Sequence, residues 1–242
     1  MHFLISVLCR ADVCNAMLSN TMPRFNLNQE GLTLTMTTSI ASLWSSSTSS
    51  QICDCDGQLQ DIIVDLRILS ANPPINALDG LISDKLYLVE RRLVVLINSF
   101  NDSSHKPHCH SVSKAAFLAA LIYLYTYLRD YPVQAPLFNS FIQSLGAALF
   151  SSSSSYDQGW QESNPSLLLW ILTTVALAAA GRPERLQFVR ELARMVTRMR
   201  ITTFQEFVAA ARQMVWIDRK DPKRDAAWRL LWRDIDALTW EL

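Results

Sequence analysis

In the last sixty residues of this chain, apolar residues recur every three or four positions, and this spacing limits the fold more than any other feature. It repeats three times, in sets that are separated by polar residues. The first set is Leu186, Val189, Leu192, Val196 and Met199, the second is Phe204, Phe207, Val208, Ala211 and Val215, and the third is Trp228, Leu231, Trp232 and Ile235. Since such spacing places the side chains of one set on one face of a helix, it predicts three helices that pack through these faces.

Residues that favour helix ends stand at the borders of these segments. Asn164 precedes a proline, Thr203 has Glu206 three residues later, and Asp221 also precedes a proline. All three are patterns of a helix start, and Gly181 is typical of a helix end. Further upstream, Ser83-Asp84 is expected to cap a helix that runs through Phe100.

Two segments, 115–128 and 167–180, are each fourteen residues of almost unbroken apolar character. A membrane-spanning helix needs roughly twenty such residues, so both are expected to be central buried helices rather than membrane spans. The first belongs to a helix over 112–129 that ends before Pro132 and Pro136, and another helix follows through Leu149.

The N-terminal part has a different composition. Residues 33–58 are dominated by Ser and Thr, which predicts a flexible linker. We therefore expect a partly disordered N-terminal segment over 1–76, with one helix at 58–71, and a helical domain over 77–242. The stretches 101–110 and 151–164 are expected to be loops. With six glycines and no strand pattern, the predicted class is all-α, a multi-helix array.

The charge balance argues against a strong polyanion-binding function. Twenty-two basic and twenty-two acidic residues cancel, so no overall field attracts nucleic acid or an acidic membrane. The five cysteines are an odd number without a disulfide pattern, which favours a reducing compartment inside the cell. The apolar run at 3–8 has no basic residue before it, so we expect no signal peptide and a true start upstream.

One loop holds a cluster of metal-binding residue types, namely His105, His108, Cys109 and His110, which Cys53 and Cys55 could join. Zinc prefers imidazole and thiolate ligands, but adjacent residues cannot easily reach one tetrahedral ion. We therefore predict no metal site. A small helical enzyme or metal-binding protein that uses the 105–110 loop stays open as the alternative.

No residues in this sequence form a recognisable catalytic pattern. A nucleophile elbow, a phosphate loop and a dinucleotide-binding turn are all absent from the sequence. Carboxylates are expected near helix ends and on outer faces, where solvation and capping explain them. The sequence therefore predicts that the chain is not an enzyme, with no catalytic, cofactor-binding or metal-binding residues and no cofactor.

Two further groups admit two interpretations each. Arg190, Arg194 and Arg198 form a stripe that could bind phosphate, but a solvated face with Glu184 and Glu191 as partners is favoured. The other group comprises Trp160, Trp170, Trp216, Trp228, Trp232 and Trp240. Core packing is the expected role of these tryptophans, with a ligand pocket as the alternative. Trp216 and Trp232 in particular are expected to anchor the last helices on the 167–180 helix.

From Asp84 onward, about two thirds of the chain, the order of several short segments resembles the fungal-specific transcription factor domain. These segments are Glu90-Arg91-Arg92-Leu93, Leu118-Ala119-Ala120-Leu121-Ile122-Tyr123-Leu124-Tyr125, Leu167-Leu168-Leu169-Trp170-Ile171-Leu172, Ala179-Ala180-Gly181, Glu184-Arg185 with Phe188-Val189, Trp216-Ile217-Asp218 and Leu231-Trp232.

The resemblance implies a helical regulatory domain in the nucleus that controls transcription of target genes, such as a metabolic or secondary-metabolite gene cluster. Its implied partners are the transcriptional machinery or other regulatory proteins, with a small-molecule effector left open. In that family a six-cysteine zinc cluster binds DNA, and Cys9, Cys14, Cys53 and Cys55 do not match its spacing. We therefore expect no sequence-specific DNA binding by this chain alone.

Overall fold

The computed structural model describes residues 54–71, 80–102, 107–150, 164–215 and 221–240, without the side chains of 54–56, 80–83, 101–102 and 107–112. These residues are helical apart from short turns, and no strand occurs in them, so the all-α prediction is confirmed. The elements are α2 (Asp54–Ala71), α3 (Gly80–Asp102), α4 (Pro107–Tyr123), the π-helical turn η2 (Leu124–Leu128), α5 (Leu137–Phe150), α7 (Pro165–Ala178), α8 (Arg185–Arg198), α9 (Phe204–Arg212) and α10 (Pro222–Thr239).

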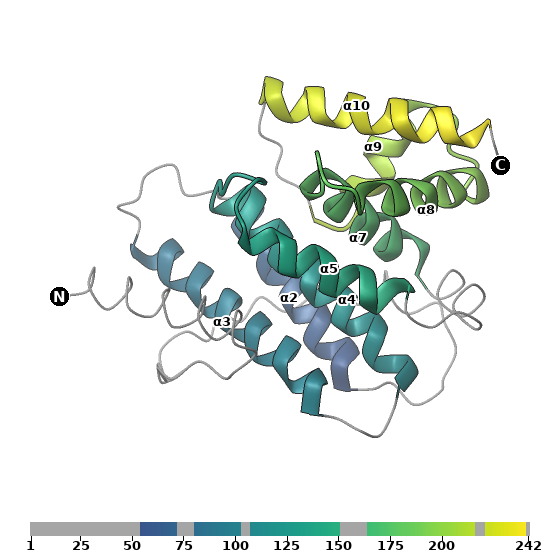
Figure 1. The fold of residues 1–242 in the computed structure, drawn as a ribbon. Coiled ribbons are helices and arrows are strands. Elements are labelled where there is room, and N and C mark those ends of the chain that lie inside the picture. The colour runs from purple at the N-terminus through teal and green to yellow at the C-terminus, as the bar shows by residue number, and fades with distance from the viewer. Residues whose placement is uncertain (1–53, 72–79, 103–106, 151–163, 216–220, 241–242) are drawn as a thin grey trace.

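Helix α4 lies at the centre of the array. It packs against α2, α3, α5 and α7, and α7 in turn packs against α8 and α9 (Figure 1). Helix α10 lies across α8 and α7 at the edge of the molecule. One continuous core of apolar side chains runs from α2 to α10.

The two apolar segments occupy the interior, as predicted. Every side chain from Ala115 to Tyr125 is at most 2% exposed, and α7 is buried along nearly its whole length. A helix that contacts neighbours on all sides can be apolar on all sides, which explains why neither segment shows an amphipathic pattern. Within the described residues, no helix combines the length and apolar character that a membrane span requires.

The three predicted helix starts are confirmed. The Asn164 side chain accepts a hydrogen bond from the backbone N–H of Leu167 at 3.0 Å, and the Asp221 carboxylate accepts one from Lys223 at 2.9 Å. Thr203 and Glu206 form a reciprocal capping box. Gly181 follows α7 with φ at 79°, a left-handed conformation that favours glycine.

Helix α2 begins earlier than predicted. It starts at Asp54, inside the predicted linker 33–58, and acidic residues in the first turn favour a helix there because they complement its dipole. Its residues Leu59, Ile62 and Leu66 are buried in the common core, and the Arg67 guanidinium donates to two backbone carbonyls just after α9. The helical body therefore includes residues on the N-terminal side of the boundary at 76. Residues 33–53 of the linker and the loop 151–163 lie outside the described residues.

Two other boundary predictions were wrong. Helix α3 starts at Gly80, so Ser83-Asp84 lies within it instead of capping it. The predicted loop 101–110 is largely helical, because α3 continues to Asp102 and α4 begins at Pro107. Proline is favoured in the first turn of a helix, where no N–H is needed, and this explains the early start of α4.

Leu186 was also predicted wrongly. It was expected to face inward with Val189 and Leu192, yet it is 52% exposed whereas those two are buried. Its angular position on α8 is at the edge of the buried face, and it lies in the first turn. At that position none of the described elements covers it.

Candidate functional site

The helix that begins as α4 widens into the π-helical turn η2 before it ends. The N–H of Arg129 donates to the carbonyl of Leu124 at 3.0 Å, and the N–H of Tyr131 donates to that of Tyr125 at 2.9 Å. Asp130 follows with φ at 51°, a left-handed conformation that is uncommon for a residue other than glycine. Because π-turns and unusual backbone conformations concentrate at functional sites, residues 123–131, here called the tyrosine turn, are the first candidate.

On one side of the tyrosine turn lies a buried ion pair. Glu90 of α3 accepts hydrogen bonds from the Tyr125 hydroxyl and the Arg129 guanidinium. The side chain of Glu90 is 1% exposed and that of Arg129 is 6% exposed. Tyr125 also packs against Phe141 and Tyr131, with ring centroids 5.9 Å and 5.4 Å away. A buried carboxylate needs such partners because desolvation otherwise costs several kcal/mol (on the order of 5).

The other side of the tyrosine turn joins α2 and α7. The Tyr123 hydroxyl shares a hydrogen bond of 3.0 Å with Ser70, which also donates to the Leu66 carbonyl at 2.6 Å. The Tyr123 ring lies 4.9 Å from that of Tyr127 and 6.0 Å from that of Trp170. Tyrosines 123, 125 and 127 therefore connect different neighbours of the central helix.

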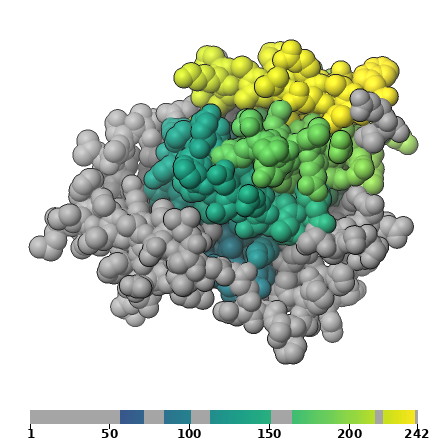
Figure 2. Space-filling view, in the orientation of Figure 1, coloured from purple at the N-terminus to yellow at the C-terminus, as the bar shows by residue number. Residues whose placement is uncertain are grey.

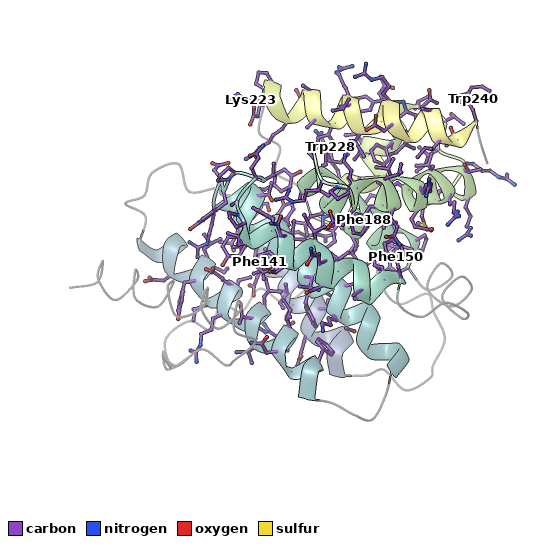
Figure 3. All side chains as sticks on the ribbon, viewed as in Figure 1. Phe141, Phe150, Phe188, Lys223, Trp228 and Trp240 are labelled. Atoms are coloured by element: carbon purple, nitrogen blue, oxygen red, sulfur yellow. The ribbon has the colours of Figure 1, made fainter. Side chains whose placement is uncertain are left out.

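Helix α10 is attached to the tyrosine turn by its first residues. The Arg224 guanidinium lies 5.0 Å from the centre of the Tyr127 ring, and it bonds to Asp130 at 2.5 Å. It also pairs with Asp221 at 3.3 Å, next to the helix start. Trp228 is 4% exposed, and it lies on the side of α10 that faces the rest of the molecule (Figure 3).

From Trp228 onward, α10 is attached to α8 and α9. The Phe207 ring of α9 contacts the rings of Trp228 and Trp232 at 5.6 Å and 5.5 Å. Arg185, at the start of α8, pairs with Asp234 at 2.6 Å. Trp232 was wrongly predicted to be a buried anchor on the 167–180 helix, because it is half-buried and its ring contacts Phe207 of α9. Trp216 lies outside the described residues.

Burial determines the protonation of the tyrosines. It raises the pKa of Tyr123, although the hydrogen bond with Ser70 lowers it in part. It also raises the pKa of Tyr127, and the charge of Arg224 offsets this in part. Both hydroxyls therefore remain protonated in the folded chain through the neutral range and well above it.

This chemistry suits a structural connection between helices. The buried hydroxyls are neutral, and Glu90 already faces Arg129. The arrangement joins α2, α3, α7 and α10 to one turn of the central helix.

The metal-binding residue types cannot be placed in a site. His105 and Cys53 lie outside the described residues, and Pro107 to His110 form the first turn of α4 without described side chains. Cys55 lies in α2, also without a described side chain. Among the side chains that are described, no three His, Cys, Asp or Glu residues come together.

The arginine stripe is exposed, as expected. Arg190, Arg194 and Arg198 all face solvent, and Arg194 pairs with Glu191. Of the tryptophans, Trp170 and Trp228 are in the core, whereas Trp240 is 85% exposed at the end of α10 (Figure 3). Trp160 lies outside the described residues.

Sequence reasoning missed the ion pair at the tyrosine turn. Carboxylates were expected at helix ends and on outer faces, yet Glu90 is buried in the middle of α3. Its position offered a signal, because it lies four residues after Leu86 and three before Leu93, on the buried face. The π-helical turn had no comparable signal in the sequence.

Comparison with known proteins adds no identification, since no family model, no curated protein and no solved structure matches this chain.

Proposed function

We propose that this chain is a non-catalytic regulatory domain of a fungal transcription factor that acts in the nucleus through protein partners. The proposal begins from the resemblance of its ordered segments to that domain family. Its target genes would include those of a metabolic or secondary-metabolite cluster. It would depend on another polypeptide or segment to read DNA.

One contact supports the proposal most directly. Glu90 belongs to the first segment of the resemblance and Tyr125 to the second, and the two side chains are hydrogen-bonded. A third segment, which contains Trp170, packs against Tyr123 of the second. Segments that were selected only by their order in the sequence thus meet around the tyrosine turn.

A reporter assay tests the proposal. The full chain is fused to an unrelated DNA-binding domain, and transcription of a reporter gene is measured in a fungal host. We expect the fusion to change transcription relative to the DNA-binding domain alone. Glu90→Gln should weaken this effect, while Asp84→Asn, a matched change at an exposed position on the same helix, should preserve it. Equal transcription from the fusion and the DNA-binding domain, at equal protein levels, would reject the proposal.

Elemental analysis of the purified chain tests the alternative function. We expect no stoichiometric zinc. One tightly held equivalent of zinc that disappears in the His108→Ala/Cys109→Ala variant would instead favour a metal-binding protein.

A further inference from the structure

Helix α8 carries a row of exposed side chains that the tyrosine turn does not use. Leu186, Arg190, Arg194 and Arg198 follow one another at intervals of four residues, so they lie side by side along one face. All four are exposed. We call them the α8 row.

The positive charge of the α8 row is only partly neutralised. Glu191 pairs with Arg194, and the carboxylate of Asp234 pairs with Arg185 beside the row. Within the described part of the chain, Arg190 and Arg198 have no ion-pair partner. Two guanidinium groups, about two helical turns apart, are therefore available to an external anion.

The C-terminal part of the sequence, which contains α8, also has an excess of basic residues. Residues 182–242 contain thirteen basic and nine acidic residues, although the whole chain is balanced. Figure 2 shows α8 and α10, in green and yellow, together on one side of the molecule. A local excess of positive charge attracts acidic partners even where the net charge of a protein is zero.

Exposed apolar side chains accompany these charges. Among the described residues, four large hydrophobic side chains are exposed, namely Tyr131, Leu186, Leu230 and Trp240. Leu186 belongs to α8, Leu230 belongs to α10, and Trp240 directly follows α10. Leu230 lies one turn before Asp234, and Asp234 pairs with Arg185, the residue that precedes Leu186. Arginine and tryptophan are enriched among the residues that dominate protein interfaces.

From these observations we propose that the α8 row binds an acidic, amphipathic segment of a partner protein. Carboxylates of that segment pair with Arg190 and Arg198, and its apolar side chains cover Leu186. A nucleic-acid backbone fits less well, because it offers no apolar group to Leu186. The proposal concerns binding alone and does not rest on the proposed function, so the reporter assay and the test below can fail separately.

Fluorescence anisotropy tests the proposal with a labelled peptide in which Asp and Glu alternate with Leu and Phe at helical spacing. We expect the wild-type chain to bind it. Arg190→Gln/Arg194→Gln/Arg198→Gln should bind about tenfold more weakly, because two exposed charge pairs and a third positive charge beside them are lost. Arg190→Gln alone should weaken binding, whereas Lys223→Gln, the same charge change at the far end of α10, should not (Figure 3). Glu191→Gln should strengthen it. Unchanged thermal midpoints confirm that the exposed variants fold.

Two further ligands, polyglutamate and an oligothymidylate, distinguish an amphipathic peptide from other anions at the α8 row. Leu186→Ser should weaken binding of the amphipathic peptide but not of polyglutamate, because only the former has apolar groups to lose. An oligothymidylate that binds more tightly than the amphipathic peptide would overturn the proposal in favour of nucleic acid. Equal affinity of the triple variant and the wild type would overturn it as well, and so would a peptide that does not bind the wild type.

Discussion

Replacing Glu90 with Gln removes the charge that faces Arg129 but preserves the size of the side chain and one oxygen acceptor. The Arg129 side chain is 6% exposed, so it cannot recover its hydration when the carboxylate is lost. Breaking a buried ion pair in this way costs about 3–5 kcal/mol. Because the Gln oxygen can still accept from Tyr125, we expect the lower limit, about 3 kcal/mol, which corresponds to a fall of roughly 6–12 °C in the thermal midpoint.

Urea unfolding followed by circular dichroism measures this loss, with Asp84→Asn as the control. A double-mutant cycle with Arg129→Met tests the cause. If the ion pair is responsible, Glu90→Gln/Arg129→Met should be considerably more stable than the sum of the two single losses predicts, since no unpaired charge remains buried. Strictly additive losses, or a Glu90→Gln variant as stable as Asp84→Asn, would refute the reasoning.

Four other outcomes are expected. Trp228→Ala should cost about 3–5 kcal/mol because a buried indole is lost, whereas Trp240→Ala should leave the thermal midpoint unchanged, and a scan of both variants checks this. Burial raises the pKa of Tyr123 and Tyr127, so these hydroxyls ionise at a lower pH in the unfolded chain than in the folded chain. The free energy of unfolding should therefore fall as the pH rises beyond about 10, and urea unfolding of Tyr127→Phe should show a shallower fall. Hydrogen bonds from backbone N–H groups lower the pKa of Glu206. The ionised Glu206 should therefore stabilise the folded chain above the ordinary glutamate pKa, and this stabilisation should be lost as the pH falls through the lowered value. In unfolding curves, Glu206→Gln should lack this acid dependence. Titration against randomised DNA duplexes at physiological salt should select no sequence, because the chain has no recognisable groove-reading motif, and selection of a defined site at nanomolar affinity would contradict this.

The sequence of this chain was sufficient to predict the features that depend on neighbouring residues. The starts of α7, α9 and α10 follow from Asn164, Thr203 and Asp221, because a cap forms between residues two or three positions apart. The central positions of α4 and α7 follow from their apolar composition, since a helix without a polar face must be covered on all sides. The all-α class follows from the same local periodicity.

Contacts between distant residues decided what the sequence could not. Glu90 and Arg129 are separated by 39 positions, and nothing in either segment indicates that the other will neutralise it. Arg67 reaches the carbonyl of Gln213 across 146 positions, and this contact helps to include α2 in the helical body. Leu186 was expected to be buried, yet it lies at the edge of the buried face of α8 and is exposed. The spacing of apolar residues predicts which face of a helix can be buried. Which part of that face is covered, and which charged side chains are buried with it, depends on the helices that pack against it.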